Sequence, residues 1–572
     1  MASSLAAIAL FAACEGEGET EPTGEASRDG AALDAALASD AISATDAALE
    51  ASGRAPLPTG KLRIAMWCGP PTAEMTQARI DEIAAAGFTT VSNACDGATY
   101  VAAYDKAMLS LAKGAGLDAI VADQRVIAAA AGTDVAANLD AVVADYAAEP
   151  ALAGYHVVDE PNASAFAALS AVVSGLKSRD PSRFAYINLL PDYASPAQLG
   201  TASYDDYVAQ FLSTVRPAIV SYDYYPFFTG GSDATTFFAN LAVVRARALA
   251  TGTPFFQFIQ AISFAGHRAT TAAEKQWVGM HTLAYGGAGV SYFTYWTPPP
   301  SPEGFGQAII DSAGHRTAQY DEVTAINRRL AAFGRYLVAA KSTGIFHSGT
   351  LAAGAAPRPP GAVAYLPNAL PITVGTFAVG DGAYALLVNR DYTKALETDV
   401  HLGTEATPEL LDVAGGTFAP VSPLGRDALG AKVHVSLAAG DGALLYLPGP
   451  LTSGAPGAEA FIGVVRADTG ALDIVDSSFG AARLRLAGWN DCPQGYALAG
   501  RQFVSNGFWL CARSDLVGRT FHVGNVVADA ATVWTVKGGQ ATSVGGASWD
   551  TCPGGKLLGH RFESNGYWVC LE

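Results

Sequence analysis

The chain alternates short apolar runs with amphipathic segments between residues 60 and 345. Between the runs, apolar residues recur at helical spacing; one such segment starts at Thr72, a favourable N-cap residue, and stops at Gly87. Eight strand–helix units in about 285 residues are typical of an α/β fold, the (β/α)8 TIM barrel. The alternative, an open doubly wound sheet, needs a glycine-rich turn after its first strand, and WCGPP at 67–71 is not one. The apolar runs cover residues 62–67, 88–93, 117–123, 152–159, 184–191, 218–226, 254–261 and 289–296.

The pattern changes twice after the barrel. In residues 346–452 the helical spacing of apolar residues is lost, and short segments with alternating apolar and polar residues appear instead. This pattern predicts a β-sandwich packed on the barrel. Residues 453–572 contain an internal repeat; its copies begin at Trp489 and Trp549, and each carries Trp-x-x-Cys-Pro followed by an aromatic-Trp-x-Cys segment. A disulfide within each copy would stabilise a unit too small to fold on a core alone. The aromatic residues fit two hypotheses equally, a carbohydrate-binding surface and buried struts beside the disulfides.

Charge and composition narrow the classes of function. The 572 residues include 35 Lys and Arg against 53 Asp and Glu, a formal net charge of −18, and 50% of them are hydrophobic. This apolar content excludes a disordered polyelectrolyte. The negative charge excludes a nucleic-acid partner, because it repels phosphate groups. The segment 15–54 carries −8 of the charge, so the folded body is nearer −10 and its acidity says little about the substrate.

The N-terminus predicts export. Residues 1–14, MASSLAAIALFAAC, resemble a bacterial lipoprotein signal in which Cys14 is lipidated. Phe11 stands where Leu is usual and the run has no Lys or Arg, so the alternative is a ragged N-terminus with a chance cysteine. Residues 15–59 then read as an acidic, Ala- and Gly-rich tether. No later run of eighteen apolar residues occurs, so we expect an envelope or secreted protein that reaches the membrane only through its lipid.

Export places the six other cysteines in an oxidising compartment, where they are expected to pair. Cys68 and Cys95 lie just past the first two predicted strands, which are neighbours in a parallel barrel. A disulfide at the barrel rim is therefore geometrically reasonable, and two free buried thiols are the alternative. The expected pairs are Cys68–Cys95, Cys492–Cys511 and Cys552–Cys570.

In barrels of this type the chemistry lies at the carboxyl ends of the strands. Here those ends carry carboxylates, amides and aromatic residues, with no His/Cys metal set and no Ser–His pair at nucleophile spacing. This set suits a poly- or oligosaccharide, because rings stack on C–H faces and carboxyl groups transfer protons. We expect no metal and no other cofactor. Each aromatic candidate could instead be an ordinary core residue, and Arg268 could instead form a surface ion pair. The candidate catalytic residues are Glu160, Asp223 and Asp159, and the candidate substrate-binding residues are Trp67, Asn188, Tyr222, Tyr225, Gln260, Arg268 and Trp296.

Two segments carry a resemblance to a known superfamily. GYHVVDEP at 154–161 resembles the fourth-strand motif of clan A glycoside hydrolases, in which an Asn-Glu-Pro supplies the general acid/base. YGGAGVSYFTYW at 285–296 and the barrel-then-sandwich layout are similar to the same superfamily, including the family 42 β-galactosidase type. The resemblance covers roughly residues 60–450 and implies that Glu160 is the proton donor. The alternative is that Asp159 and Glu160 cap the helix that follows.

The resemblance fails at strand seven. FFQFIQAIS at 255–263 carries Gln where clan A enzymes carry a nucleophilic Glu, and Gln cannot form the glycosyl ester. Three hypotheses remain. Asp223 pairs with Glu160 as base or nucleophile, and the carboxyl separation then decides inversion or retention. Asp159 orients the acetamido group of an N-acetylhexosaminide while Glu160 donates the proton. In the third hypothesis, the site is degenerate and binds glycan without hydrolysing it.

Overall fold

The computed structural model describes most of residues 57–572. The expected lipidation site Cys14, the tether up to residue 56, and Trp489 and Trp549 of the repeats lie outside the described residues. None of the helices in the described part is long and apolar enough to cross a membrane. Within 57–572 the undescribed positions are 232, 234, 349–361, 367–369, 428–429, 452–459, 467–468, 476–482, 486–491, 493–495, 503–506, 514–515, 517, 528–529, 547–551, 554 and 562–566.

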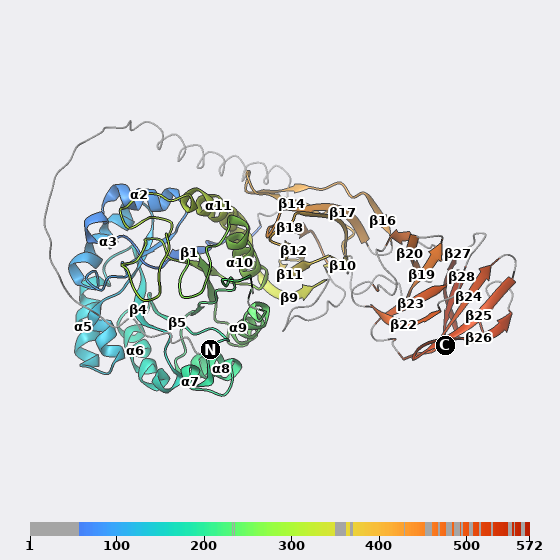
Figure 1. Cartoon of the computed structure of the whole chain (residues 1–572), viewed down its shortest axis with the longest axis horizontal. Helices are drawn as coiled ribbons and strands as arrows, with labels where there is room; N and C mark the ends of the chain where they lie inside the picture. The colour runs from blue at the N-terminus through green and yellow to red at the C-terminus, as the bar shows by residue number, and fades with distance from the viewer. Residues whose placement is uncertain are drawn as a thin grey trace.

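Eight parallel strands form the first unit and curl into a nearly closed barrel (Figure 1). The strands are β1 (Arg63–Met66), β2 (Thr90–Ser92), β3 (Asp118–Val121), β4 (Leu152–Asp159), β5 (Phe184–Leu189), β6 (Val220–Tyr222), β7 (Phe255–Gln260) and β8 (Gly289–Phe293). Their order is β1-β8-β7-β6-β5-β4-β3-β2. At the seam between β1 and β2, Thr89 N donates to Ile64 O at 2.8 Å and Gly69 N donates to Asn93 O at 2.8 Å. The eight predicted strands are confirmed.

Helices surround the barrel and cover the outer face of its sheet. The predicted start at Thr72 is wrong: residues Thr72–Glu74 form one 3-10 turn, and α2 begins after Thr76, whose hydroxyl accepts from Arg79 N at 3.3 Å. The predicted end holds, since α2 stops before Gly87. The helices are α2 (Gln77–Ala85), α3 (Ala102–Gly114), α4 (Gln124–Ala130), α5 (Val135–Tyr146), α6 (Phe166–Arg179), α7 (Pro196–Leu199), α8 (Tyr204–Thr214), α9 (Phe237–Thr251), α10 (Ala272–Ala284) and α11 (Gln319–Leu337).

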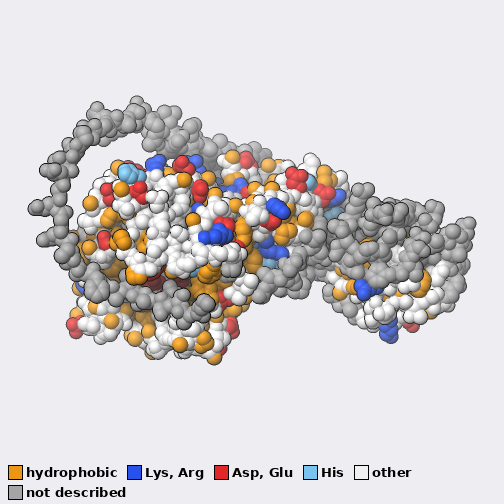
Figure 2. All heavy atoms as spheres, in the orientation of Figure 1, with side chains coloured by type: hydrophobic (Ala, Val, Ile, Leu, Met, Phe, Trp, Pro, Cys, Tyr) orange, Lys and Arg blue, Asp and Glu red, His pale blue; other side chains and the backbone are white. Residues whose placement is uncertain are grey.

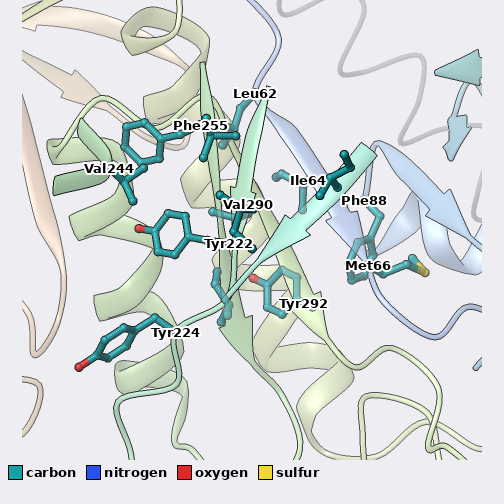
Figure 3. Packing of buried hydrophobic residues seen from close by; sticks show 14 of the residues in the cluster. Leu62, Ile64, Met66, Phe88, Tyr222, Tyr224, Val244, Phe255, Val290 and Tyr292 are labelled. Carbon is teal, nitrogen blue, oxygen red and sulfur yellow. The ribbon is translucent and has the colours of Figure 1, made fainter. Parts of the chain in front are cut away.

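The main hydrophobic core lies between the barrel sheet and these helices. Figure 3 shows part of it, with Tyr222 of β6 pointing toward Val244 of α9. Strands of a parallel barrel are covered on both faces, which is why their sequences are nearly continuous apolar runs. On the face in Figure 2, acidic and basic side chains are interspersed over the barrel.

Two antiparallel sheets form the second unit, as the alternating pattern predicts. One has the order β15-β14-β18-β12-β11-β9 and the other β10-β13-β17-β16, with an apolar core between them. The six-stranded sheet also packs on α10, where Trp277 Nε1 donates to Arg390 O at 3.0 Å. The strands are β9 (Lys341–His347), β10 (Val363–Tyr365), β11 (Ile372–Val379), β12 (Gly382–Asn389), β13 (Leu396–Leu402), β14 (Glu409–Asp412), β15 (Thr417–Pro420), β16 (Gly425–Asp427), β17 (Gly430–Leu437) and β18 (Gly442–Leu447).

Gly375 of β11 marks the closest approach between the sandwich and the barrel helices. A Cβ atom at this position would lie 2.3 Å from the carbonyl oxygen of Ala284 on α10. We expect Gly375→Ala to lower the free energy of unfolding by about 1–3 kcal/mol, because the backbones must separate to admit the methyl group. Thermal unfolding of the full chain measures this. Gly425→Ala in the same sandwich is the control, since a Cβ there meets no atom within 4 Å; equal melting temperatures for the two variants would contradict the expectation.

The third unit is one ten-stranded sheet built from two copies of a five-stranded arrangement. The copies have the orders β21-β20-β19-β23-β22 and β26-β25-β24-β28-β27, joined by a parallel pairing of β22 with β26. The final hairpin of each copy even has its register shift at the same place, after Leu498 in one and after Leu557 in the other. The strands are β19 (Ala460–Arg466), β20 (Thr469–Val475), β21 (Arg483–Arg485), β22 (Tyr496–Gln502), β23 (Phe508–Arg513), β24 (Phe521–Val527), β25 (Ala530–Lys537), β26 (Gly539–Gly546), β27 (Lys556–Arg561) and β28 (Tyr567–Leu571).

All three expected disulfides are present: Cys68–Cys95, Cys492–Cys511 and Cys552–Cys570. Beside the last two, the aromatic pairs of the repeat are buried, and Trp509 and Trp568 have no exposed surface. Each tryptophan faces a glycine across an antiparallel pairing, Gly463 in one copy and Gly524 in the other. For these aromatic residues the structure favours buried struts over a carbohydrate-binding surface.

Candidate active site

Three adjacent strands bring the predicted polar residues together at one end of the barrel. Asp159 ends β4 and is in register with Asn188 of β5, and Glu160 N donates to Asn188 O at 2.9 Å. Asp223 directly follows β6, and its N–H is 3.4 Å from the carbonyl oxygen of Leu189 at the end of β5. Carboxyl ends of neighbouring parallel strands lie at one edge of the sheet, so these side chains share the barrel mouth.

A chain of hydrogen bonds holds the amide of Asn188. Its Nδ2 donates to Asp159 Oδ1 at 3.1 Å, and its Oδ1 accepts from Ser221 Oγ at 3.1 Å. Ser221 is in turn 2.8 Å from the hydroxyl of Tyr186. The amide orientation is therefore determined, and Asn188 holds the Asp159 carboxyl group at the mouth. Burial raises the pKa of this carboxyl group to about 6, and the hydrogen bond from Asn188 partly opposes the shift.

Glu160 has an uncommon backbone conformation, with φ = 46°. For a residue with a side chain this left-handed conformation costs about 1–3 kcal/mol, and it persists where the surroundings require it. The capping alternative does not explain it, because Asn162 caps the following turn by accepting from Ser164 N at 2.9 Å. Glu160 is half-buried, and the charges of Asp223 and Asp159 both act on its carboxyl group.

Burial and neighbouring charge favour the protonated form of Glu160. Burial raises the pKa of Glu160 far above its ordinary value, and the charges of Asp223 and Asp159 raise it further. Burial also raises the pKa of Asp223, and the charge of Asp159 raises it further. The Oδ1 atom of Asp223 is buried without a hydrogen-bond partner. Neighbouring carboxyl groups of this kind do not all ionise readily, so the site favours a protonated acid at neutral pH, as a general acid requires.

Glu303 belongs to the same mouth and was not among the predicted residues. It lies on the long segment between β8 and α11, is half-buried, and acts electrostatically on both Asp159 and Glu160. Nothing in the local sequence SPEGFGQ marks it, because the segment has no periodicity and its approach to β4 exists only in the closed ring.

An aromatic pocket adjoins the carboxyl groups. Its cavity volume is only about 30 Å³, and Trp67, Tyr100, His156 and Tyr186 are among the residues that line it, whereas Asp159, Glu160 and Asp223 are not. The Trp67 ring meets His156 edge-on, with centroids 5.2 Å apart. Burial raises the pKa of Tyr100, and the charge of Asp159 raises it further. The Tyr100 hydroxyl therefore lies on the side of the pocket that is nearer to Asp159. Of these residues only Trp67 was predicted; Tyr186 could have been found, because it lies two residues before Asn188 and shares its face of β5.

Some predicted substrate-binding residues lie elsewhere. Tyr222 is fully buried in the layer between the barrel and its helices, because it precedes Asp223 and successive strand residues point to opposite faces (Figure 3). Arg268 binds the buried Glu274 at 2.6 Å, so the ion-pair alternative describes it. Gln260 Nε2 donates to the backbone carbonyls of Ile262 and Arg268 at 3.0 and 2.6 Å, which occupies its NH2 group, whereas its Oε1 is buried without a hydrogen-bond partner.

Two other predicted aromatic residues remain near the mouth. Tyr225 is buried against Phe264, with ring centroids 5.2 Å apart, and forms the wall beside Asp223. Trp296 lines a separate pocket with the Cys68–Cys95 disulfide, and the Arg79 guanidinium lies 5.1 Å from its ring centroid. Within the described part of the chain, no group of three or more His, Cys, Asp and Glu side chains is arranged to hold a metal ion.

The comparisons with known proteins are distant. No family model and no curated protein matches the chain. It is similar to the β-galactosidase of Bacillus circulans sp. alkalophilus (10% identity, 68% of this chain and 99% of that one, TM-score 0.47) and to a glycoside hydrolase family 5 protein of Bacteroides vulgatus (10%, 67% and 89%, 0.44). For the β-galactosidase of the psychrophilic Marinomonas ef1 the values are 11%, 50% and 62%, with a TM-score of 0.38, so the chain spans about three fifths of that enzyme. No conclusion about activity rests on likenesses of this size.

Proposed function

We propose that this protein is a glycoside hydrolase whose proton donor is Glu160. The observation that supports this most directly is the position of the half-buried Glu160 at the barrel mouth, where burial and the charges of Asp223 and Asp159 raise its pKa and favour the protonated acid at neutral pH. A protonated carboxyl group next to a ring-lined cavity suits protonation of a glycosidic oxygen while the sugar stacks on the rings.

In this proposal Asp223 is the proton partner of Glu160. Glu160 gives its proton to the leaving oxygen as the glycosidic bond breaks, and the charge of Asp223 sets how strongly that proton is held until then. Asn188 keeps Asp159 oriented toward the sugar.

An N-acetylhexosaminide is the second candidate substrate, and the placement of Asp159 favours it. Its exposed carboxylate is adjacent to the proposed acid and is held by Asn188, as needed to orient an acetamido group. We therefore propose a test with aryl β- and α-glycosides of neutral hexoses and with aryl N-acetylglucosaminides. Hydrolysis of any of these supports the proposed function, and preference for the acetamido sugar assigns Asp159 this role. Binding of oligosaccharides without any hydrolysis would instead indicate a glycan-binding protein.

The charge of Asp223 also predicts a pH dependence. Because the charge of Asp223 raises the pKa of Glu160, Asp223→Asn should lower that pKa. The alkaline limb of kcat/KM should then move to lower pH by about one unit or more, because Glu160 loses its proton earlier. A pH–rate profile measures this, with Asp381→Asn on the exposed hairpin of the sandwich as the matched control. If the alkaline limb of kcat/KM stays in place or moves to higher pH, the charge of Asp223 does not raise the pKa of Glu160.

We also propose that the protein is exported and anchored through a lipid on Cys14. The three disulfides support an oxidising compartment, where such bonds persist. Labelling of cells with palmitate tests the anchor: the wild type should incorporate the label and Cys14→Ser should not. An unlabelled wild type would contradict the anchor without affecting the proposed activity.

A further inference from the structure

We propose that Glu303 is a second catalytic carboxylate, which faces Glu160 across the barrel mouth and acts as the base for the attacking water. This inference rests on the proposed function, because it assigns a role in the same hydrolysis. It supplies the group that strand seven lacks, because Gln257 and Gln260 stand there without a carboxylate.

The topology relates the segment of Glu303 to the strand of Glu160. In the strand order, β8 and β4 are four positions apart in a ring of eight, so their ends lie across the mouth from each other. Glu160 follows β4, and Glu303 lies on the segment that follows β8. The proposal therefore sets the two carboxyl groups on opposite sides of a bound sugar.

The segment around Glu303 is attached to the end of β7. Ala265 N donates to Glu303 O at 2.7 Å, and Gly306 N donates to Ser263 O at 2.9 Å. Between these two bonds, the Phe305 ring packs against Phe264 with centroids 6.4 Å apart. The backbone of Glu303 is therefore held over the strand whose own residues carry no carboxylate.

The side chain of Glu303 is free to act. It is half-buried, and it makes no hydrogen bond or ion pair with any side chain in the part of the chain that the structure describes. Its charge nevertheless reaches Asp159 and Glu160, without a hydrogen bond to either. A half-buried carboxylate that acts on the acid without a hydrogen bond to it suits the role of a base in an inverting site.

The proposed hydrolysis forms one bond to the anomeric carbon, breaks one, and moves two protons. Glu303 takes a proton from a water molecule whose oxygen forms a bond to the anomeric carbon. The bond between that carbon and the glycosidic oxygen breaks, and its electron pair stays on the oxygen. Glu160 protonates this oxygen, so the products are a free sugar of inverted configuration and an alcohol. Water is the only co-reactant.

Glu303→Gln and Glu303→Ala test the assignment in the full chain. We expect kcat on an aryl glycoside that the wild type hydrolyses to fall at least about 100-fold in both variants, with little change in KM. Azide should restore turnover of Glu303→Ala and yield a glycosyl azide, because the small anion fits the vacated space. NMR of the wild-type reaction should show inversion. Gln307→Ala, an exposed change on the same segment, is the control and should retain activity.

The outcomes separate this inference from the proposed function. If the wild type hydrolyses its substrate and Glu303→Gln retains kcat within a factor of two, Glu303 is not catalytic while the function stands. Loss of activity that azide does not restore would assign Glu303 to the shape of the segment and overturn the proposal, as would retention of configuration. If the wild type hydrolyses no glycoside, the proposed function itself fails.

Discussion

Replacing Glu160 by Gln is expected to lower kcat about 10³- to 10⁴-fold on glycosides with poor leaving groups, because no other group can protonate the leaving oxygen. On dinitrophenyl glycosides the loss should be much smaller, since that leaving group departs without a proton. Substrate binding should persist, as Gln preserves the size of the side chain. A fully active variant would exclude Glu160 as the acid. Equal losses on both substrate types would indicate a different role.

The same variant should be more stable than the wild type at pH 8. The folded-state pKa of Glu160 is raised, whereas in the unfolded chain a Glu ionises near pH 4. Between the unfolded-state and folded-state pKa values of Glu160, the unfolded chain releases a proton that the folded protein keeps. The free energy of unfolding therefore falls as the pH rises through this range. Gln carries no such proton, so Glu160→Gln should raise the melting temperature at pH 8 and less so at pH 4. The exposed Glu405→Gln in the sandwich is the control and should change neither.

Trp568→Ala is expected to have the largest effect on stability, lowering that of the C-terminal unit by about 3–5 kcal/mol. The ring is fully buried and covers Gly524 of the neighbouring strand, where a Cβ atom would lie 2.0 Å from it. Removing the ring leaves a cavity beside the Cys552–Cys570 disulfide that the paired strands cannot fill. Hydrogen exchange over β24 and β28 measures the loss of protection.

Val544→Ala is the matched control for the tryptophan change. Val544 lies on β26 of the same sheet and is 57% exposed, so its truncation should change stability by less than about 0.5 kcal/mol. If hydrogen-exchange protection over β24 and β28 were equal in Trp568→Ala and Val544→Ala, the aromatic residues of the repeat would not be essential to its packing. A binding role for them would then regain support.

Most of the fold could be predicted because its signals are local. The apolar runs, the helical spacing between them and the stop at Gly87 each depend on a few neighbouring residues. The three disulfides were predictable for the same reason, since each pair spans 18 to 27 residues within one small arrangement of strands. The start of α2 was misplaced by one short turn, because Thr72 and Thr76 are equally good caps in sequence.

The candidate site was predictable only in part. Glu160 and Asp223 were found because strand ends are marked by the preceding apolar runs. Tyr222 was assigned to the same mouth, although alternation along β6 sends it to the opposite face from Asp223. Gln260 and Arg268 have the right chemistry for binding a sugar. However, the NH2 group of Gln260 donates to backbone carbonyls, and the Arg268 guanidinium is paired with Glu274. Such competition for hydrogen bonds is a property of the packed state.

The sequence by itself determined the order of the elements, the ends of the strands and the partners of six cysteines, because each follows from spacing along the chain. Only the tertiary structure decided which carboxyl groups meet. Closing eight strands into a ring brings Glu160 and Asp223 to the same end of the barrel, joins the segment of Glu303 to the loop after β7 and turns Tyr222 into the core. These distances arise between residues up to 143 positions apart, from Glu160 to Glu303, and no local pattern encodes them.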